Sequence, residues 1–274
     1  MRADDSSPLV LIPGSAATSK VWQADFLIGL AEDRQVITFD PRGFGSNDST
    51  PVDELTIDNI ASSLVDFMDA LGLEQPDVLG WSWGGYIALW LGAFYGDSVG
   101  NLVLFSTTSG GDGLFIGAGQ DQLSIYDEMG QDVPHAAIYP DNDDGNEGLC
   151  RFIAFLKIMP GPTMTSDQIR AQSAIVNAAL SNNTLTEALP SITNPAFVGH
   201  GALDILLDIE NARFLYKQLN NVSLALGLDA GHAYLFQDVE STVEDVTDFL
   251  DYYDSNDDDD DYGDYGYTLT AASN

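Results

Sequence analysis

One serine in the sequence has the neighbours expected of a nucleophile. The segment Gly80-Trp81-Ser82-Trp83-Gly84-Gly85 follows a short apolar run, and a helical pattern then continues to Gly96. A serine in a strand-to-helix turn, with glycine two positions before and two after it, is typical of a nucleophile elbow. Such a turn strains the serine backbone and exposes its hydroxyl, and the helix N-terminus directs N–H groups at any oxyanion formed there. The alternative is a glycine-rich turn in which Ser82 only caps the helix, and the motif alone leaves both interpretations open.

A serine nucleophile needs a general base, and the base needs an acid to orient it. The sequence contains three histidines. His232 lies in a loop directly after the last predicted core strand, at the same sheet edge as Ser82, and is the predicted base; the alternative is a surface histidine. His135 falls in an inserted segment and is predicted to be structural. His200 is predicted to be a turn residue at the end of a strand.

The predicted acid is Asp204, which follows the strand at 196–199 and lies one loop before His232. The chain has so many aspartates that only its position distinguishes this one, since most aspartates lie at the surface. Asp208 and Asp112 are the alternatives. The order Ser82, Asp204, His232 is the one expected when the nucleophile sits on an elbow of this kind.

Two backbone N–H groups are predicted to stabilise an oxyanion. One belongs to Trp83, next to the nucleophile. The other belongs to Ser15, in the turn after the first predicted strand, where Gly14 would let the backbone come close to the reacting carbonyl. Trp81 and Trp83 flank the serine, and at least one of them is expected to form an apolar wall of the substrate pocket.

The elements that must position these residues alternate between strand and helix. Short buried strands are predicted at 9–12, 35–40, 76–80 and 101–105, with helices at 19–31, 58–71 and after Ser82. This alternation predicts right-handed crossover units, and therefore a mostly parallel sheet of about six strands with helices on both faces. Ligands bind at the carboxyl ends of such strands, where the candidate residues fall.

Between residues 109 and 190 the alternation stops. Helical patterns appear near 149–159 and 166–180, and the stretch 140–148 has an acidic, turn-like composition. So long an insert is predicted to form a helical cap over the sheet edge. Strands resume at 196–199 and 222–226, and a last helix is predicted at about 239–252. The domains expected are therefore a core of 1–108 and 191–253, a cap of 109–190, and a disordered acidic tail of 254–274.

The charge of the chain is strongly negative. It has 43 acidic and 9 basic residues, a net charge of −34, and eight of the acids lie between Asp251 and Asp264. This argues against nucleic acid, anionic membranes and strongly anionic substrates as partners. A saline habitat, in which salt screens the self-repulsion, is the natural hypothesis.

The tail lacks a calcium-loop pattern, and the single cysteine, Cys150, excludes an internal disulfide. The first seven residues lack a signal-peptide pattern and no apolar run is long enough to span a bilayer, so the compartment and the oligomeric state stay open.

Five segments together resemble the α/β-hydrolase fold family, in its branch of serine hydrolases with a helical cap that includes esterases and prolyl aminopeptidases. They are 11–14, 39–46, 80–85, 201–204 and 230–236. The resemblance implies a triad of Ser82, Asp204 and His232, an oxyanion hole from Ser15 and Trp83, and no metal or cofactor. Pro13 departs from the family, which usually has histidine there. Ser82 argues against the haloalkane dehalogenase and epoxide hydrolase branches, which place aspartate at this position.

A second departure is that the sequence starts almost directly at the strand predicted from Leu9, whereas family members usually carry a strand hairpin before it. Either the native sequence is longer, or the sheet has six strands and the strand at 36–39 is an uncovered edge.

The function expected is hydrolysis of a small uncharged or apolar ester through an acyl-enzyme. A prolyl-type aminopeptidase, a lactonase, a carbon–carbon bond hydrolase or a perhydrolase would use the same triad. A catalytically silent binding module is the alternative from another class.

Overall fold

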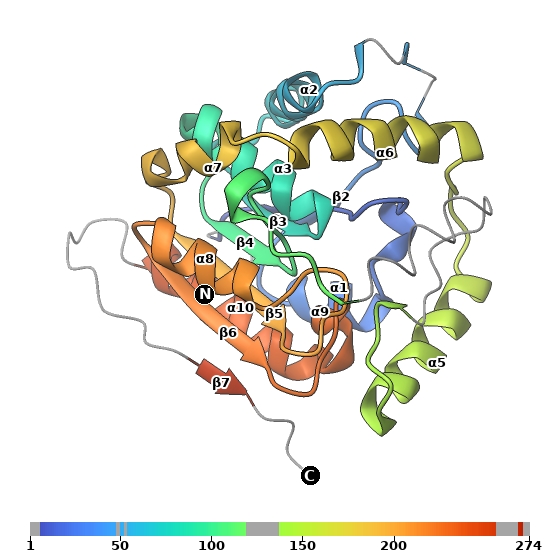
Figure 1. Ribbon diagram of the computed structural model, residues 1–274. Helices are drawn as coiled ribbons and strands as arrows, with labels where there is room; N and C mark the ends of the chain where they lie inside the picture. The colour runs from blue at the N-terminus through green and yellow to red at the C-terminus, as the bar shows by residue number, and fades with distance from the viewer. Residues whose placement is uncertain (1–5, 48–49, 52–53, 119–136, 256–267, 271–274) are drawn as a thin grey trace.

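The protein is built around a parallel β-sheet with helices on both faces (Figure 1). The computed structural model describes residues 6–47, 50–51, 54–118, 137–255 and 268–270. The strand order is β2-β1-β3-β4-β5-β6-β7, and every strand pair is parallel. The strands are β1 (Leu9–Ile12), β2 (Val36–Thr38), β3 (Asp77–Trp81), β4 (Leu102–Phe105), β5 (Ala196–Gly201), β6 (Val222–Gly227) and β7 (Thr268–Thr270). The first six confirm the predicted strands.

Strands β1 and β4 are apolar throughout, and β3 and β5 are buried along their whole length, because the sheet is covered on both faces. Successive side chains of a strand point to opposite faces. In β1, Val10 and Ile12 therefore join one hydrophobic cluster, while Leu9 and Leu11 join the other. The first cluster packs against α2 (Ile57–Ala70), α3 (Trp83–Phe94) and α8 (Glu210–Gln218). The second packs against α1 (Ala24–Leu30), α9 (Tyr234–Gln237) and α10 (Val239–Ser255).

The helix expected over 19–31 is divided in two. A short 3-10 helix (Ser19–Val21) precedes α1, and the backbone of Trp22 and Gln23 between them is extended. The break buries the Trp22 ring, which stacks on Phe26 with 6.1 Å between ring centroids. Burial of an aromatic ring thus outweighs continuity of the helix at this point.

The described part of the segment between β4 and β5, residues 106–118 and 137–195, contains three α-helices. They are α5 (Asp143–Ile158), α6 (Ser166–Leu180) and α7 (Thr184–Ala188). The structure begins α5 earlier than the helical pattern at 149–159 predicted, because the side chain of Asn142 accepts a hydrogen bond from the N–H of Gly145 and caps the helix. The acidic residues read as a turn are Asp143 and Asp144 of the first helical turn, where the helix dipole favours negative charge. Figure 1 shows α6 and α7 near α2 and α3, and α5 near α9.

The two ends of the sheet differ from each other. At one end β2 pairs with β1 alone among the described strands, which makes it an edge of the sheet, one of the two alternatives that the sequence left open. At the other end β7 pairs with β6 in the register Ala225 to Thr268. The prediction of a disordered tail is therefore wrong for 254–255, which continue α10, and for β7; residues 256–267 and 271–274 lie outside the described part.

A buried ion cluster joins elements at the amino end of the sheet. Arg34 is 2% exposed, and its guanidinium lies 2.6 Å from Asp251, 3.3 Å from Asp254 and 3.7 Å from Asp77. Asp77 also accepts hydrogen bonds from the backbone and side-chain N–H groups of Asn101. Burial raises the pKa of Asp77 to about 7; the Asn101 hydrogen bonds and Arg34 oppose the shift, and the negative charge of Asp254 adds to it.

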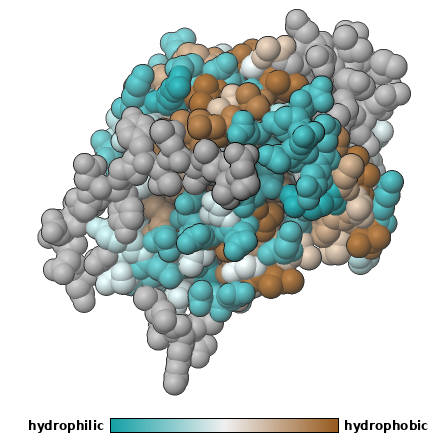
Figure 2. All heavy atoms as spheres, turned by 90° about the horizontal axis from the view of Figure 1, so that it is seen from below, coloured by the Kyte–Doolittle hydropathy of each residue, from teal (hydrophilic) through white to brown (hydrophobic). Residues whose placement is uncertain are grey.

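The surface is mixed rather than uniformly polar. Figure 2 shows hydrophilic residues covering much of one face, with hydrophobic patches between them. Among the most exposed large apolar side chains are Ile158 and Ile28. Within the described residues, no helix has both the length and the apolar character needed to cross a membrane.

Candidate active site

Ser82 occupies a strained turn between β3 and α3. Its backbone angles are φ 56° and ψ −117°, a conformation that residues with a side chain rarely adopt. Two neighbours hold the turn: the Ser82 N–H donates to the carbonyl of Phe105 at 2.8 Å, and the Thr107 hydroxyl donates to the Ser82 carbonyl at 2.7 Å. Both neighbours lie at or just after the end of β4, so the adjacent strand fixes the conformation of the elbow.

The two glycines that flank Ser82 are required by close backbone contacts. A Cβ added to Gly84 would lie 2.0 Å from the carbonyl oxygen of Ile12, and one added to Gly80 would lie 2.2 Å from that of Gly84. Real atoms cannot approach so closely, so any side chain at either position would force the turn apart. The start of α3 is thereby packed directly against the end of β1.

Asp204 and His232 form a buried hydrogen-bonded pair. The distance between His232 Nδ1 and Asp204 Oδ2 is 2.7 Å, and both side chains are almost fully buried. The other carboxylate oxygen, Oδ1, accepts from the N–H groups of Leu206 and Leu207. Burial would raise the pKa of Asp204, but the charge and hydrogen bond of His232, with contributions from His200 and Leu207, hold that pKa below its usual value. An ionised carboxylate at this position makes Nδ1 the protonated nitrogen and leaves Nε2 as the acceptor.

The loop that carries His232 is joined to the strand that carries Ser82. The indole N–H of Trp81 donates to the His232 carbonyl at 2.9 Å, and the two rings lie 5.7 Å apart. Among the described residues the Ser82 hydroxyl makes no hydrogen bond of its own. In sites without substrate, the hydrogen bond between nucleophile and base is often long and tightens only when substrate binds.

The turn after β1 lies beside the nucleophile. A Cβ added to Gly14 would lie 3.3 Å from Ser82 Cβ, so the backbone passes within contact distance of Ser82. Ser15 follows and is exposed. Trp83 is the first residue of α3, where a backbone N–H has no acceptor within the helix. The two N–H groups predicted to bind an oxyanion therefore belong to segments on either side of Ser82.

Both tryptophans beside Ser82 pack mainly into the protein interior. Trp81 is 5% exposed and contacts Phe236, and Trp83 is 4% exposed and stacks on Tyr86 with 5.0 Å between ring centroids. Their contacts show how they stabilise the elbow. Their predicted role as a wall of the substrate pocket stays a prediction.

His200 differs from its prediction. It is not a turn residue but lies within β5, fully buried, with Nε2 3.0 Å from the carbonyl oxygen of Leu207 and 3.4 Å from Asp204 Oδ2. Burial lowers the pKa of His200, which favours a neutral ring, although the charge of Asp204 opposes the shift. Sequence reasoning missed this contact with the proposed acid; the available signal was a position four residues before Asp204.

The two alternative acids have other partners. Asp208 accepts a hydrogen bond from the N–H of Glu210 at the start of α8, and Asp112 bonds the side chain of Asn183. Neither bonds His232, so the structure favours Asp204 over both. His135 lies outside the described residues.

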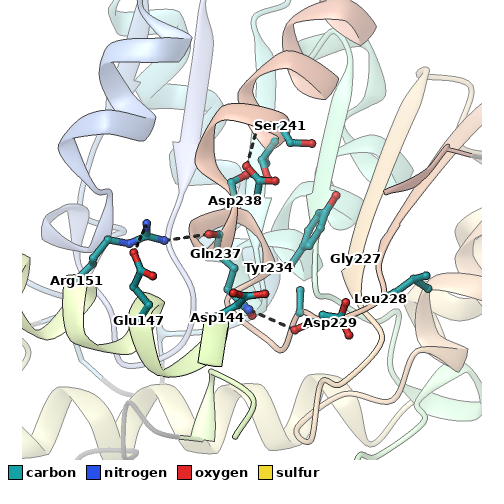
Figure 3. A pocket seen from close by; sticks show the side chains of 12 residues that line it. Asp144, Glu147, Arg151, Gly227, Leu228, Asp229, Tyr234, Gln237, Asp238 and Ser241 are labelled. Atoms are coloured by element: carbon teal, nitrogen blue, oxygen red, sulfur yellow. Dashed lines mark hydrogen bonds and ion pairs between the residues drawn. The ribbon is translucent and has the colours of Figure 1, made fainter. Parts of the chain in front are cut away.

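The loop around His232 is held by the segment that leads into α5 and by α9. Asn142 donates to the carbonyl of Asp229, the N–H of Gly231 donates to the side chain of Gln237 at 2.6 Å, and the N–H of Ala233 donates to the carbonyl of Ile138. Figure 3 shows a pocket beside this loop, with Arg151 of α5 bonded to the Gln237 carbonyl. The volume of the pocket is about 230 Å³. This pocket is lined by none of Ser82, Asp204 and His232, so it is separate from the candidate active site.

Comparison with known proteins agrees with the fold. A family model described as alpha/beta hydrolase fold matches residues 7–158. The chain is 25% identical over 247 residues to 3-oxoadipate enol-lactonase 1 of Acinetobacter baylyi, an alignment that covers 88% of this chain and 87% of that protein. An alpha/beta hydrolase fold protein from Chitinophaga pinensis superposes with a TM-score of 0.79 at 24% identity, over 90% of each chain. An esterase from Exiguobacterium antarcticum superposes with a TM-score of 0.70 at 21% identity, over 89% of this chain and 92% of that one.

The family match spans more than half of the chain, and it confirms the resemblance that the five sequence segments suggested. The protein belongs to the α/β-hydrolase fold family and is an enzyme of the hydrolase class.

Proposed function

We propose that the protein hydrolyses small, uncharged or apolar carboxylic esters through an acyl-enzyme on Ser82. The observation that carries this proposal is the 2.7 Å hydrogen bond between Asp204 and His232, in a loop that Trp81 ties to the Ser82 elbow. An imidazole with a buried carboxylate on one nitrogen and a strained serine nearby has the parts of an acyl-transfer site.

In the proposed reaction His232 takes the hydroxyl proton of Ser82 at Nε2 while the serine oxygen attacks the ester carbonyl. Asp204 keeps the proton on Nδ1 and stabilises the positive ring that results. The N–H groups of Ser15 and Trp83 bind the oxyanion of the tetrahedral intermediate. The C–O bond to the alcohol then breaks, the alcohol leaves with the proton from His232, and water hydrolyses the acyl-enzyme by the same steps.

The charge of the protein favours neutral substrates. With a net charge of −34, the surface repels anions as they approach, and the repulsion is strongest at low ionic strength. An uncharged ester meets no such barrier. We therefore expect p-nitrophenyl acetate or butyrate to be hydrolysed faster than an ester of similar size with a free carboxylate.

The test of the nucleophile is the Ser82→Ala variant. Wild-type protein should hydrolyse p-nitrophenyl esters and react with a fluorophosphonate probe. The variant should lose essentially all of both activities, with a circular dichroism spectrum like that of the wild type. Ester hydrolysis retained by Ser82→Ala would refute the assignment of Ser82 as the nucleophile. A folded wild-type protein that neither reacts with the probe nor hydrolyses the esters would favour a silent binding module.

A lactone is the second candidate substrate. The observation that favours it is the relative named 3-oxoadipate enol-lactonase, which aligns over 88% of this chain. Opening a lactone breaks the same bond as ester hydrolysis, so it needs no further catalytic group. Graded acyl esters, lactones, proline amides and vinylogous carbon–carbon substrates should be compared by kcat/KM. A highest value for proline amides or for the carbon–carbon substrates would replace our proposal with one of the other activities of the same triad.

A further inference from the structure

A buried glutamine of the cap segment bonds the turn beside Ser82. Gln172 lies on α6, is 4% exposed, and its Oε1 accepts a hydrogen bond from the N–H of Ala16 at 2.6 Å. The partner is a backbone donor, which requires an acceptor, so the carboxamide oxygen must face Ala16. The residues are 156 positions apart in the sequence, and no sequence motif links them.

Ala16 needs such a partner because its backbone is strained. Its φ is +55°, in the left-handed region that residues with a Cβ rarely adopt. The strained conformation persists only where the surroundings hold it. The Thr18 hydroxyl donates a second hydrogen bond to the cap segment, at the carbonyl of Pro162 (2.9 Å). This bond holds the turn two residues after Ala16.

The bond also decides which donor of the turn is available. The N–H of Ala16 is occupied by Gln172, whereas the N–H of Ser15 makes no hydrogen bond among the described residues. The turn itself lies in contact with Ser82 at Gly14. The Gln172 bond holds the peptide group between Ser15 and Ala16, which directly follows the one that carries the Ser15 N–H, and so restrains where that N–H points.

The same face of α6 contacts the helix on the other side of the serine. The buried residues of α6 are Gln172, Ile175 and Ala179, at a spacing that places them on one face. The Tyr86 hydroxyl donates to the carbonyl of Ala179 at 3.3 Å, and Tyr86 stacks on Trp83. One helix thus contacts both segments that carry the proposed oxyanion donors.

We propose that Gln172 is a positioning residue of the oxyanion hole, which holds the Ser15 N–H in place by bonding Ala16. This rests on the proposed function, because it concerns the oxyanion formed when Ser82 attacks an ester. Oxyanion stabilisation acts in the transition state more than on the bound substrate. Loss of the Gln172 bond should therefore lower kcat and leave KM little changed.

The test compares Gln172→Met with a matched variant, Gln168→Met. Methionine keeps the length of the side chain and removes the acceptor. Gln168 lies one turn earlier on α6 and donates to the carbonyls of Gly43 and Gly45, so it ties the same helix to the core away from Ser82. Gln172→Ser, which is too short to reach Ala16 and cannot overpack the interface, is the second variant if Gln172→Met does not fold.

Three measurements are made on wild type and variants: kcat and KM for a p-nitrophenyl ester, the inhibition constant of phenylboronic acid, and the thermal unfolding midpoint. Boronic acid forms a tetrahedral anionic adduct with an active-site serine and so reports the oxyanion hole. We expect kcat of Gln172→Met to fall roughly 10- to 100-fold, as for a displaced or weakened oxyanion donor, and the inhibition constant to rise with it. Gln168→Met should keep wild-type kcat, even if its unfolding midpoint falls as much.

Failure of the proposed function and failure of the proposed role of Gln172 give different results. Wild-type protein that shows neither turnover nor fluorophosphonate labelling refutes the proposed function itself. An active wild type with Gln172→Met and Gln172→Ser as active and as boronate-sensitive as Gln168→Met refutes the role of Gln172 and leaves the proposed function intact.

Discussion

The buried carboxyl of Asp77 makes the stability of the fold depend on pH in a direction that can be worked out. Its pKa is about 7 in the folded protein and 3.8 in the unfolded chain, because it is buried beside Asp254 with only one guanidinium nearby. Between these values the folded protein binds a proton that the unfolded chain has released. The free energy of unfolding therefore falls as pH rises from about 4 to about 7.

The size of the effect follows from the pKa difference. A difference of about 3 units, at about 1.4 kcal/mol per unit, gives a loss of about 4 kcal/mol across this window. The variant Asp77→Asn cannot ionise, yet its carbonyl oxygen can still accept the two hydrogen bonds from Asn101. We expect the variant to match wild type near pH 4 and to be more stable above pH 7, by up to about 4 kcal/mol.

The assay is urea unfolding followed by tryptophan fluorescence at several pH values between 4 and 8, in 1 M NaCl. Other carboxylates also titrate in this range, so the quantity to plot is the difference between variant and wild type, in which they cancel. A difference that stays constant across the range would refute the reasoning, since it would mean that Asp77 titrates alike in the folded and unfolded protein.

Two further predictions concern the site and the charge. Asp204→Asn should lower kcat by about 10⁴-fold while the fold survives, because an amide no longer holds the His232 ring in the tautomer whose Nε2 can accept a proton. Asp208→Asn is the matched control, and its kcat should stay within a few-fold of wild type. Equal losses of kcat in both variants would contradict the assignment of Asp204. The thermal unfolding midpoint should rise between 0.1 and 1 M NaCl, as the screening length shrinks from about 10 to about 3 Å. A midpoint indifferent to salt would argue that the acidic surface does not destabilise the fold by self-repulsion.

The sheet and the elbow could be predicted because their signals are local. Continuous apolar runs mark strands buried on both faces, and the glycines around Ser82 mark a turn whose close contacts are now visible at Gly84. The pairing of Asp204 with His232 followed from a topological rule, that parallel strands end at one edge, without knowledge of any distance.

What could not be predicted depends on contacts between distant segments. His200 lies at the predicted end of a strand, immediately before a predicted turn, yet β5 continues through it to Gly201. Gly201 instead leaves room for a crossing segment: a Cβ there would lie 2.2 Å from the carbonyl oxygen of Gly231. Strand β7 lies in a tail whose Asp- and Gly-rich composition predicts disorder, yet its backbone pairs with the edge of β6. The bond between Gln172 and Ala16 has no sequence signal of any kind.

The bonds from Ile138 and Asn142 to the loop around His232 have a practical consequence for protein engineering. A graft that removes residues 138–142 would also remove supports of the loop that carries the His232 imidazole. A chimaera should therefore keep residues 138–142, which anchor the loop of the base, and also Gln172, which bonds the turn beside Ser82.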